Sequence, residues 1–300
     1  MCANCNNSVT SWFLLLSLLS FKNLFSKSFS IRNNNNMNPR TKSLILVGGG
    51  HANIQVMKSL STLSKDVRQL LNVTLVDKYD CATYSGMIPG CVSNQYTTKD
   101  ASIPFMPLAK YSNISFYQDT VVDIQSNHVV TSSGRFIKYD CLSLDIGSTV
   151  RGLDDIDGVR EYTIPTRPIN HLISRIEKAE KTMLNDREDK QYSLVVVGGG
   201  FAGIEMALTL RNRWRNIISS SSLSVTIINS DTQLLSSESS SCRDFMNKIL
   251  QTNNITVLNS TFVSKITKTA IEFGNHDISD LTYTHCIWAA GKFRKHIVKI

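Results

Sequence analysis

Two stretches of the chain, about 150 residues apart, share one pattern of apolar and polar positions. In the first, the apolar run Leu44–Val47 precedes three glycines and then apolar residues at helical spacing. In the second, Leu194–Val197 precedes three glycines and a similar spacing. A short, fully apolar run is typical of a buried parallel strand, and apolar residues three and four positions apart are typical of a helix. Each stretch therefore predicts a strand, a glycine turn and a helix.

The first of these units continues into an apolar strand, Val73–Val76, that ends at Asp77. Gly48 permits a tight turn, and Gly50 lets the backbone approach a pyrophosphate at the positive end of the helix. Asp77 stands where an acid accepts hydrogen bonds from the adenosine ribose. Asn53 replaces the last glycine of the GxGxxG pattern, which predicts a slightly wider contact between helix and strand. The alternative is a glycine-rich turn in another kind of α/β protein. The apolar helical positions are Ile54, Met57, Leu60 and Leu63.

The second unit has the complete pattern, with Gly198, Gly200 and Gly203. Its next strand, Val225–Ile228, ends at Asn229 rather than at an acid. Gly203 in place of alanine favours NADH, whereas the missing acid leaves NADPH open. We expect Glu205 in the first helical turn, where the helix dipole alone also favours an acid. A purely structural glycine turn is the alternative. The apolar helical positions are Ile204, Ala207, Leu208 and Leu210.

Short alternating segments follow each unit and predict two small antiparallel meanders. Each meander is followed by an apolar strand that ends in glycine, Cys141–Ile146 before Gly147 and Cys286–Ala290 before Gly291. The pattern therefore predicts an α/β chain with two Rossmann-like dinucleotide-binding units, each built on a βαβ core. The meander segments are Ile114–Tyr117, Val121–Ile124, His128–Thr131 and Phe136–Tyr139, then Thr256–Asn259, Phe262–Ile266 and Ala270–Phe273.

Composition and charge agree with a globular protein of two domains. The chain has 300 residues, of which 42% are hydrophobic and 19% charged. Four basic residues and no acid lie in residues 1–40, so half of the net charge of +8 belongs there. No basic cluster with interleaved aromatic residues is present, which argues against nucleic acid as a partner. The seven cysteines are scattered and odd in number, so we expect neither a disulfide framework nor a metal site.

Residues 1–40 predict a disordered leader or a targeting segment. The apolar run Trp12–Phe21 is shorter than the roughly twenty residues of a membrane-spanning helix, so we expect no transmembrane helix. A basic, Ser-rich and acid-free segment is typical of a mitochondrial transit peptide. The alternatives are an extension without function and translation from Met37. We therefore expect a mitochondrial or a cytoplasmic protein.

Beyond these patterns, the chain resembles the FAD-dependent pyridine nucleotide–disulfide oxidoreductase superfamily, in its type II NADH-dehydrogenase-like branch. It is most similar to the NADH-dehydrogenase-like module that precedes selenide, water dikinase in some proteins. The resemblance covers roughly residues 42–291, and YSGMIPG is its branch-specific part. The segments that carry it are VGGGHANIQVM (47–57), VTLVDKYDCATYSGMIPGCV (73–92), YDCLSLDIGSTV (139–150), IPTRPI (164–169), VVVGGGFAGIEMA (195–207) and WAAG (288–291).

The resemblance implies a site for FAD in the first unit and one for NAD(P)H, with NADH favoured, in the second. Hydride would pass from NAD(P)H to the flavin and then to an acceptor such as a quinone. Glu205 would lie near the nicotinamide and the flavin as an orienting catalytic candidate, and His51 would begin a helix facing the cofactor. The implied FAD-site residues are Gly48, Gly49, Gly50, His51, Ala52 and Asp77, with Tyr84, Ser85, Gly86 and Pro89 at the flavin edge. The implied NAD(P)H-site residues are Gly198, Gly200, Phe201, Ala202, Gly203 and Glu205, and Gly147 and Gly291 end the strands that cross between domains.

The chain also departs from the family. Cys81 and Cys91 are ten positions apart, so we interpret them as ordinary loop cysteines rather than a redox disulfide. After Gly291 the family returns to its FAD domain and adds a C-terminal domain, so we expect this chain to be truncated. The expected domains are 41–163 for FAD, 164–291 for NAD(P)H and a tail at 292–300. A non-catalytic, nucleotide-binding remnant that senses redox state or binds a partner is the alternative function, and a homodimer is a further expectation.

Overall fold

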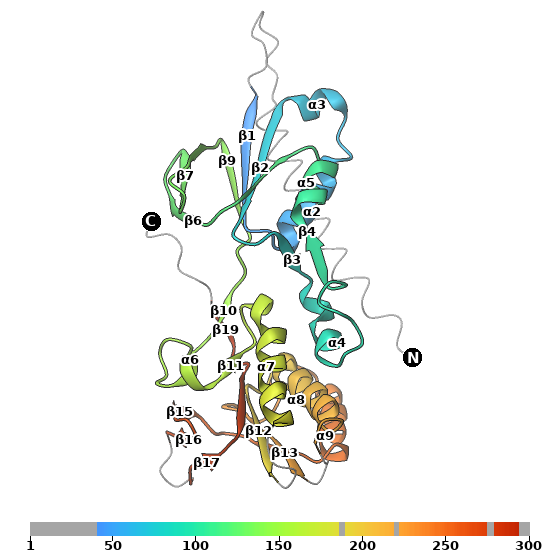
Figure 1. The fold of residues 1–300 in the computed structure, drawn as a ribbon, viewed down its shortest axis with the longest axis vertical. Coiled ribbons are helices and arrows are strands. Elements are labelled where there is room, and N and C mark those ends of the chain that lie inside the picture. The colour runs from blue at the N-terminus through green and yellow to red at the C-terminus, as the bar shows by residue number, and fades with distance from the viewer. Residues whose placement is uncertain (1–40, 186–189, 219–221, 275–278, 294–300) are drawn as a thin grey trace, which may run out of the picture. The chain divides into compact units, whose positions relative to one another are not determined.

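The computed structural model describes residues 41–185, 190–218, 222–274 and 279–293. The predicted leader at 1–40 and residues 294–300 of the predicted tail lie outside the described residues. Two parallel sheets organise the described chain, each with helices on one face and a meander on the other (Figure 1). This is the predicted α/β class with two Rossmann-like units.

The first sheet has four parallel strands in the order β5-β2-β1-β9. Ile45 and Val47 pack on the meander side, against Val129. Met57 and Phe105, fully buried, come from the helices beside the sheet. The strands are β1 (Lys42–Val47), β2 (Leu71–Asp77), β5 (Ser115–Gln118) and β9 (Cys141–Leu144), the meander is β6 (Val121–Ile124), β7 (His128–Thr131) and β8 (Phe136–Lys138), and the helices are α2 (His51–Leu60), α3 (Lys65–Gln69) and α5 (Phe105–Tyr111).

The second sheet has five parallel strands in the order β11-β18-β12-β13-β14. Alternate residues of its strand β12 point to opposite faces of the sheet. Leu194 and Val196 pack against the helices, and Val195 and Val197 pack against the meander. The strands are β11 (Ile164–Pro165), β12 (Tyr192–Val197), β13 (Leu223–Ile228), β14 (Ile255–Leu258) and β18 (His285–Trp288), the meander is β15 (Val263–Ile266), β16 (Ala270–Phe273) and β17 (Leu281–Thr282), and the helices are α6 (Val159–Tyr162), η2 (Ile169–His171), α7 (Leu172–Leu184), α8 (Phe201–Trp214) and α9 (Ser240–Thr252).

Two of the predicted meander strands belong to the parallel sheets instead. The segment predicted at 114–117 forms β5, which pairs in parallel with β2 through Leu75 and Phe116. The segment predicted at 256–259 forms β14, which pairs in parallel with β13. An edge strand with one solvated face shows the same alternation as a meander strand, so the pattern does not reveal its partner.

The helix after the first glycine turn is one turn shorter than its apolar spacing predicts. It ends at Leu60, and Leu63 is exposed. The hydroxyl of Ser61 donates to the Lys58 carbonyl, and that of Thr62 donates to the Ser59 carbonyl. These side chains satisfy carbonyls of the last turn and so offer the backbone an alternative to a longer helix.

An excursion of residues 81–104 leaves the first unit after β2. It begins and ends with β3 (Cys81–Thr83) and β4 (Ser102–Pro104), which pair antiparallel, and between them lie η1 (Ser85–Met87) and α4 (Ile88–Val92). Two further short strands, β10 (Thr149–Val150) and β19 (Lys292–Phe293), pair antiparallel after Gly147 and Gly291. The predicted domain boundary at 163/164 stays a prediction.

Candidate functional site: a cavity over the first glycine turn

The first glycine turn brings the ends of three strands together. Gly48 has a φ of +83°, and a Cβ atom there would lie 2.3 Å from the carbonyl oxygen of Asp145, which follows β9. A Cβ atom at Gly49 would lie 1.9 Å from the ring of Phe105. Both positions therefore require glycine, because backbone or a buried ring occupies the space of any side chain.

Asp77 lies beside this turn, as the sequence predicts. Its carboxylate accepts hydrogen bonds from the backbone N–H of Gly49 at 2.6 Å and of Tyr79 at 2.8 Å. An ionised carboxylate has about four acceptor positions, so two remain for other donors. Asp77 is thus held in a fixed orientation with capacity to bind hydroxyl groups.

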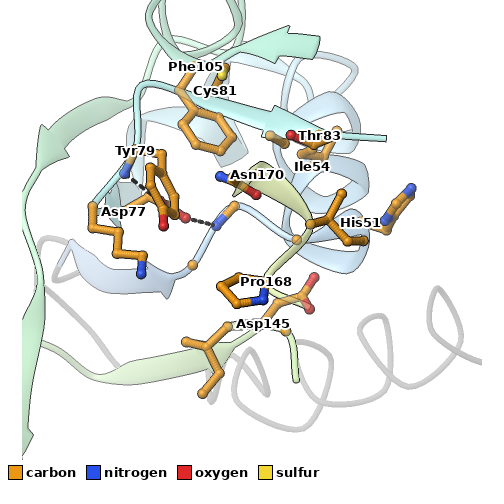
Figure 2. Close-up of a pocket in the computed structure, with 18 of the residues that line it drawn as sticks. His51, Ile54, Asp77, Tyr79, Cys81, Thr83, Phe105, Asp145, Pro168 and Asn170 are labelled. Atoms are coloured by element: carbon orange, nitrogen blue, oxygen red, sulfur yellow. Dashed lines mark hydrogen bonds between the residues drawn. The ribbon is translucent and has the colours of Figure 1, made fainter. Parts of the chain in front are cut away.

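A cavity of about 680 Å³ opens over the turn (Figure 2). Its size lies within the roughly 300–1,000 Å³ typical of small-molecule sites. Nine of the predicted site residues line it: Gly48, Gly49, Gly50, His51, Ala52, Asp77, Tyr84, Ser85 and Gly147. The predicted adenine-nucleotide end and part of the predicted flavin edge therefore face one space.

Tyr84 and His51 form a contact between the excursion and the start of α2. Their ring centroids are 4.9 Å apart, and both side chains are exposed. Pro89, also predicted at the flavin edge, does not line the cavity. It lies in the first turn of α4, whose neighbours Ile88 and Val92 are buried in the core formed with α7 and α8.

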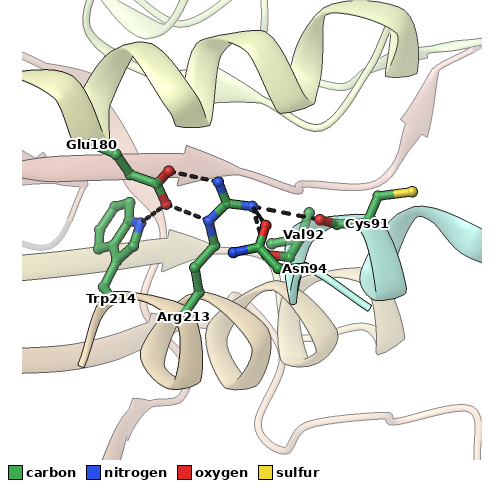
Figure 3. A network of polar contacts seen from close by, with 6 residues as sticks. All are labelled: Cys91, Val92, Asn94, Glu180, Arg213 and Trp214. Atoms are coloured by element: carbon green, nitrogen blue, oxygen red, sulfur yellow. Dashed lines mark hydrogen bonds and ion pairs between the residues drawn. The ribbon is translucent and has the colours of Figure 1, made fainter. Parts of the chain in front are cut away.

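A buried ion pair fixes α4 on these helices (Figure 3). Arg213 of α8 pairs with Glu180 of α7, and Trp214 donates to the same carboxylate at 2.9 Å. The Arg213 guanidinium also donates to the Val92 carbonyl at 3.0 Å and to Asn94 Oδ1 at 2.8 Å. A cation at the carboxyl end of a helix satisfies its last carbonyls, so Arg213 anchors the segment that follows the predicted flavin edge.

Sequence reasoning missed several residues that line the cavity. Asp145 is signalled by its place just before Gly147 at the end of a strand, but its role depends on the turn that it meets. The segment from Arg167 to Asn170 precedes α7 and overlaps IPTRPI, but nothing in the sequence places it beside the glycine turn of the first unit. The missed residues that the site most clearly contains are Lys78, Tyr79, Phe105, Asp119, Asp145, Arg167, Pro168 and Asn170.

Asp119, which lines the cavity, carries a stable negative charge. Hydrogen bonds from Ser133, Thr131 and Ser132 hold the pKa of Asp119 well below its usual range. Asp119 also accepts from the backbone N–H of Thr120. The cavity therefore combines acids with the cations of Lys78 and Arg167.

The second glycine turn is built differently. A Cβ atom at Gly203 would lie 1.9 Å from the carbonyl oxygen of Gly198, whereas one at Gly200 would meet nothing within 4 Å. Phe201 and Ala202, the first residues of α8, are exposed. The helix thus packs tightly on its own turn while the space above its N-terminus stays open.

Asn229 follows β13 directly, where the first unit has Asp77 at the end of β2. It is buried, and its amide donates to Asn259 Oδ1 at 2.8 Å and to the Asp231 carbonyl at 3.0 Å. Asp231 itself is exposed. The neutral amide therefore takes the place that Asp77 has in the first unit.

Glu205 is the fifth residue of α8, and no acid lies in the first turn of that helix. The prediction of an acid in the first turn is therefore wrong by about one residue, because the helix begins at Phe201, directly after the glycines. Desolvation raises the pKa of Glu205 above its ordinary value. Its side chain is exposed and does not line the cavity of the first unit.

Gly147 and Gly291 occupy matching positions three residues after β9 and β18. Both have positive φ, +72° and +40°. Each leads into one of the two antiparallel strands, β10 and β19. The chain therefore leaves both units through the same kind of turn.

Cys81 lies in β3 and Cys91 in α4, so the prediction that both are loop cysteines is wrong, because residues 81–104 form short strands and helices of their own. Cys81 lines the cavity, and Cys91 is buried in α4, where its thiol donates to the Thr97 carbonyl at 3.5 Å. All five cysteines of the described ranges are free thiols. Burial raises the pKa of both Cys81 and Cys91.

Within the described ranges, no helix is both long and apolar enough to cross a bilayer. The same part of the chain contains no group of three or more His, Cys, Asp or Glu side chains placed to hold a metal ion.

Comparison with known proteins agrees with this architecture. The chain is 22% identical over 254 residues to the NADH dehydrogenase-like protein YutJ of Bacillus subtilis, covering 83% of this chain and 65% of the relative. It is 25% identical over 249 residues to the alternative NAD(P)H-ubiquinone oxidoreductase C1 of Arabidopsis thaliana, covering 77% and 46%. The chain thus spans about half to just under two thirds of these curated relatives.

A solved structure shares the fold. The structure of NDH2 from Plasmodium falciparum in complex with NADH superimposes with a TM-score of 0.71 at 20% identity, over 85% of this chain and 56% of the other. The family model described as pyridine nucleotide-disulphide oxidoreductase matches residues 42–296. The chain belongs to the pyridine nucleotide-disulphide oxidoreductase family.

Proposed function

We propose that the protein is an FAD-dependent NAD(P)H oxidoreductase, with FAD in the first unit and NAD(P)H in the second. The observation that carries the proposal is the cavity over Gly48–Gly50, which is lined by Asp77 and by the predicted flavin-edge residues Tyr84 and Ser85. Two turns of one topology in one chain match the need for two dinucleotides.

The residues of the first cavity fit the ADP half of FAD. The three glycines carry no side chains of their own into the cavity, and Asp77 has two acceptor positions free for ribose hydroxyls. One group disagrees with the fit, since the carboxylate of Asp145 lies over Gly50. Bound FAD would accept a hydride from NAD(P)H and deliver the electrons to an acceptor.

The chain's own residues would bind and orient. Asp77 would hold the ribose, and Tyr84 and Ser85, which line the cavity, would border the flavin. Arg213, by fixing α4, would keep the flavin-edge segment in place. Glu205 would orient the nicotinamide, and desolvation favours its protonated form relative to a free glutamate.

The names of the relatives support proposals for the electron acceptor and the cellular location. The Arabidopsis relative is named a chloroplastic/mitochondrial NAD(P)H-ubiquinone oxidoreductase, which supports a quinone as acceptor and a location in an organelle. A cytoplasmic location stays a prediction. Gly203 supports NADH as the preferred donor, and the homodimer remains a prediction.

The test is reconstitution of the full chain with FAD. We expect flavin absorbance to remain with the protein after gel filtration, and NADH to be oxidised when a short-chain ubiquinone is present. The absence of both retained flavin and NADH oxidation would contradict the proposal.

An NAD(H)-binding module without turnover is a second candidate, and one contrast favours it. The space above Gly200 is open, whereas the space above Gly50 is filled by a carboxylate. Calorimetric titration with NADH, with and without FAD, separates the candidates. Binding of NADH that is unaffected by FAD and leads to no turnover would favour the module.

A further inference from the structure

The N-terminus of α2 is occupied by a side chain from another strand. The Asp145 carboxylate accepts from the backbone N–H of Ala52 at 2.8 Å and of Asn53 at 3.3 Å. A Cβ atom at Gly50 would lie 2.2 Å from the carboxylate carbon of Asp145. In Figure 2, Asp145 lies beside Pro168 at the edge of the cavity. The carboxylate therefore covers the start of the helix on the cavity side.

This position matters because of the charge of the helix end. The first backbone N–H groups of a helix have no partners within it and carry a partial positive charge, so they bind phosphate groups or carboxylates. The first turn of α2 has no acid of its own, and Gly50 offers no side-chain cap. Asp145 is the anion that satisfies these groups, and a diphosphate would need the same groups.

The second unit shows the same position without the acid. Val47 is in register with Leu144 in the first sheet, and Val197 is in register with Trp288 in the second. The next residues, Asp145 and Ala289, are therefore equivalent. Each presents its carbonyl oxygen to the first glycine of its turn, at 2.3 Å and 2.6 Å from the built Cβ atoms of Gly48 and Gly198.

We propose that Asp145 sets the affinity of the first unit for its ligand by competing with the diphosphate of a dinucleotide for the N-terminus of α2. Entry of the ligand requires the carboxylate to leave Ala52 and Asn53 or to share the helix end with a second anion. The first unit therefore binds diphosphate ligands more weakly than its glycine turn alone would allow. The choice of FAD as the ligand rests on the proposed function, whereas the competition concerns any diphosphate.

The test uses the full chain and two probes. Calorimetry measures FAD binding, and protection of Cys81 from iodoacetamide by ADP, read by mass spectrometry, reports on the first cavity because Cys81 lines it. We expect Asp145→Ala to bind both probes about tenfold more tightly, the equivalent of roughly one side-chain cap. Asp145→Asn loses the charge but keeps an acceptor oxygen, so we expect it to bind both probes more tightly than the wild type by a smaller factor. The matched control is Asp123→Asn, which removes an acid of the meander outside the cavity.

The outcomes separate this inference from the proposed function. Unchanged or weaker binding in both Asp145 variants, with the wild type retaining FAD, overturns the inference alone. Tighter ADP protection in the variants, with no FAD bound and no NADH oxidised by any protein, supports the inference and contradicts the proposed function. Failure of every protein to bind either probe overturns both. Asparagine keeps the size and an acceptor oxygen, so Asp145→Asn provides the test even where Asp145→Ala does not fold.

A reciprocal variant sharpens the result. Ala289→Asp places a carboxylate at the equivalent position of the second unit, and we expect it to weaken NADH binding by about tenfold. Undiminished binding of NADH by this variant would contradict the electrostatic reason given for Asp145.

Discussion

The two glycine turns of this chain each join a parallel strand to a helix, but different contacts hold each helix against its turn. In the second unit, Gly203 lies so close to the Gly198 carbonyl that a methyl group would not fit. In the first unit, the buried amide of Asn53 fills that gap, donating to the Gly48 carbonyl at 2.7 Å and accepting from the Ser143 hydroxyl at 2.7 Å. The predicted wider contact between helix and strand stays a prediction, and the position of Asn53 contains a hydrogen-bonded bridge to β9.

The comparison teaches that a missing glycine need not mean a damaged turn. Asn53 does for the first unit what close backbone packing does for the second, because its amide satisfies a buried carbonyl and a hydroxyl together. The two turns also differ in charge, since one helix start is covered by Asp145 and the other is open.

The most disruptive change is expected at the tighter turn. Gly203→Ala forces its methyl group into the Gly198 carbonyl, and the helix start must move. We expect a loss of about 3 kcal/mol or more in the free energy of unfolding, measured by urea denaturation. The matched control is Gly200→Ala, where a Cβ atom meets nothing within 4 Å. Equal stability of the two variants would contradict the close packing.

A smaller loss is expected when the first turn is given the glycine of the second. Asn53→Gly restores the GxGxxG pattern but leaves the Gly48 carbonyl and the Ser143 hydroxyl without their buried partner. We expect a destabilisation of about 2–3 kcal/mol by urea denaturation. Ser143→Ala, which removes one hydrogen bond of the bridge, should cost about 1 kcal/mol. A gain in stability for Asn53→Gly would contradict a stabilising role for the hydrogen bonds of the Asn53 side chain.

Coenzyme choice provides a third way to sharpen the comparison. Asn229→Asp places an acid where the first unit has Asp77, so it should repel the 2′-phosphate of NADPH and bind the ribose of NADH. We expect the ratio of NADH to NADPH affinity to rise about tenfold, as measured by calorimetry. Asp231→Asn, which changes an exposed acid two positions on, serves as the control. An unchanged ratio would place coenzyme choice elsewhere.

The smallest effect concerns thiol reactivity in the two units. Because the pKa of Cys81 is raised, less thiolate is present at neutral pH than in a free cysteine, and alkylation should be slower. The rate should then rise about tenfold per pH unit until the pH reaches that raised pKa. Cys286, buried in β18 with a strongly raised pKa, should stay unlabelled until the protein unfolds. Mass spectrometry shows the order in which the two thiols are labelled. Labelling of Cys286 before Cys81 would contradict the placement of Cys81 in the cavity.

The features that the sequence predicts correctly are formed by residues that lie close together in the chain. Strand, glycine turn, helix and second strand follow one another within about thirty residues, so periodicity and glycine placement reveal them directly. Asp77 was found in the same way, because it ends the strand that follows the turn. Leu63 and Glu205 were misplaced by about a turn or less, since hydroxyl side chains and glycines decide where a helix ends or begins.

The features that the sequence does not predict depend on contacts between segments far apart in the chain. The pairing of β5 with β2 and of β14 with β13 depends on which sheet edge is open, and alternation in the sequence does not reveal it. The attachment of α4 to α8 joins Arg213 to carbonyls more than a hundred positions earlier in the chain. No local pattern identifies such a contact, because it exists only once both helices are in place.

By itself, the sequence determined two dinucleotide-type turns, their order and the acid that follows the first. Only the tertiary structure decided how each turn is closed and which groups face it. β9 follows the turn by about ninety residues but lies beside β1 in the sheet. For this reason Asn53 links the turn to Ser143, and Asp145 caps the helix. Apolar periodicity is a local property, whereas the polar partners of a buried turn depend on which strand the sheet places next to it.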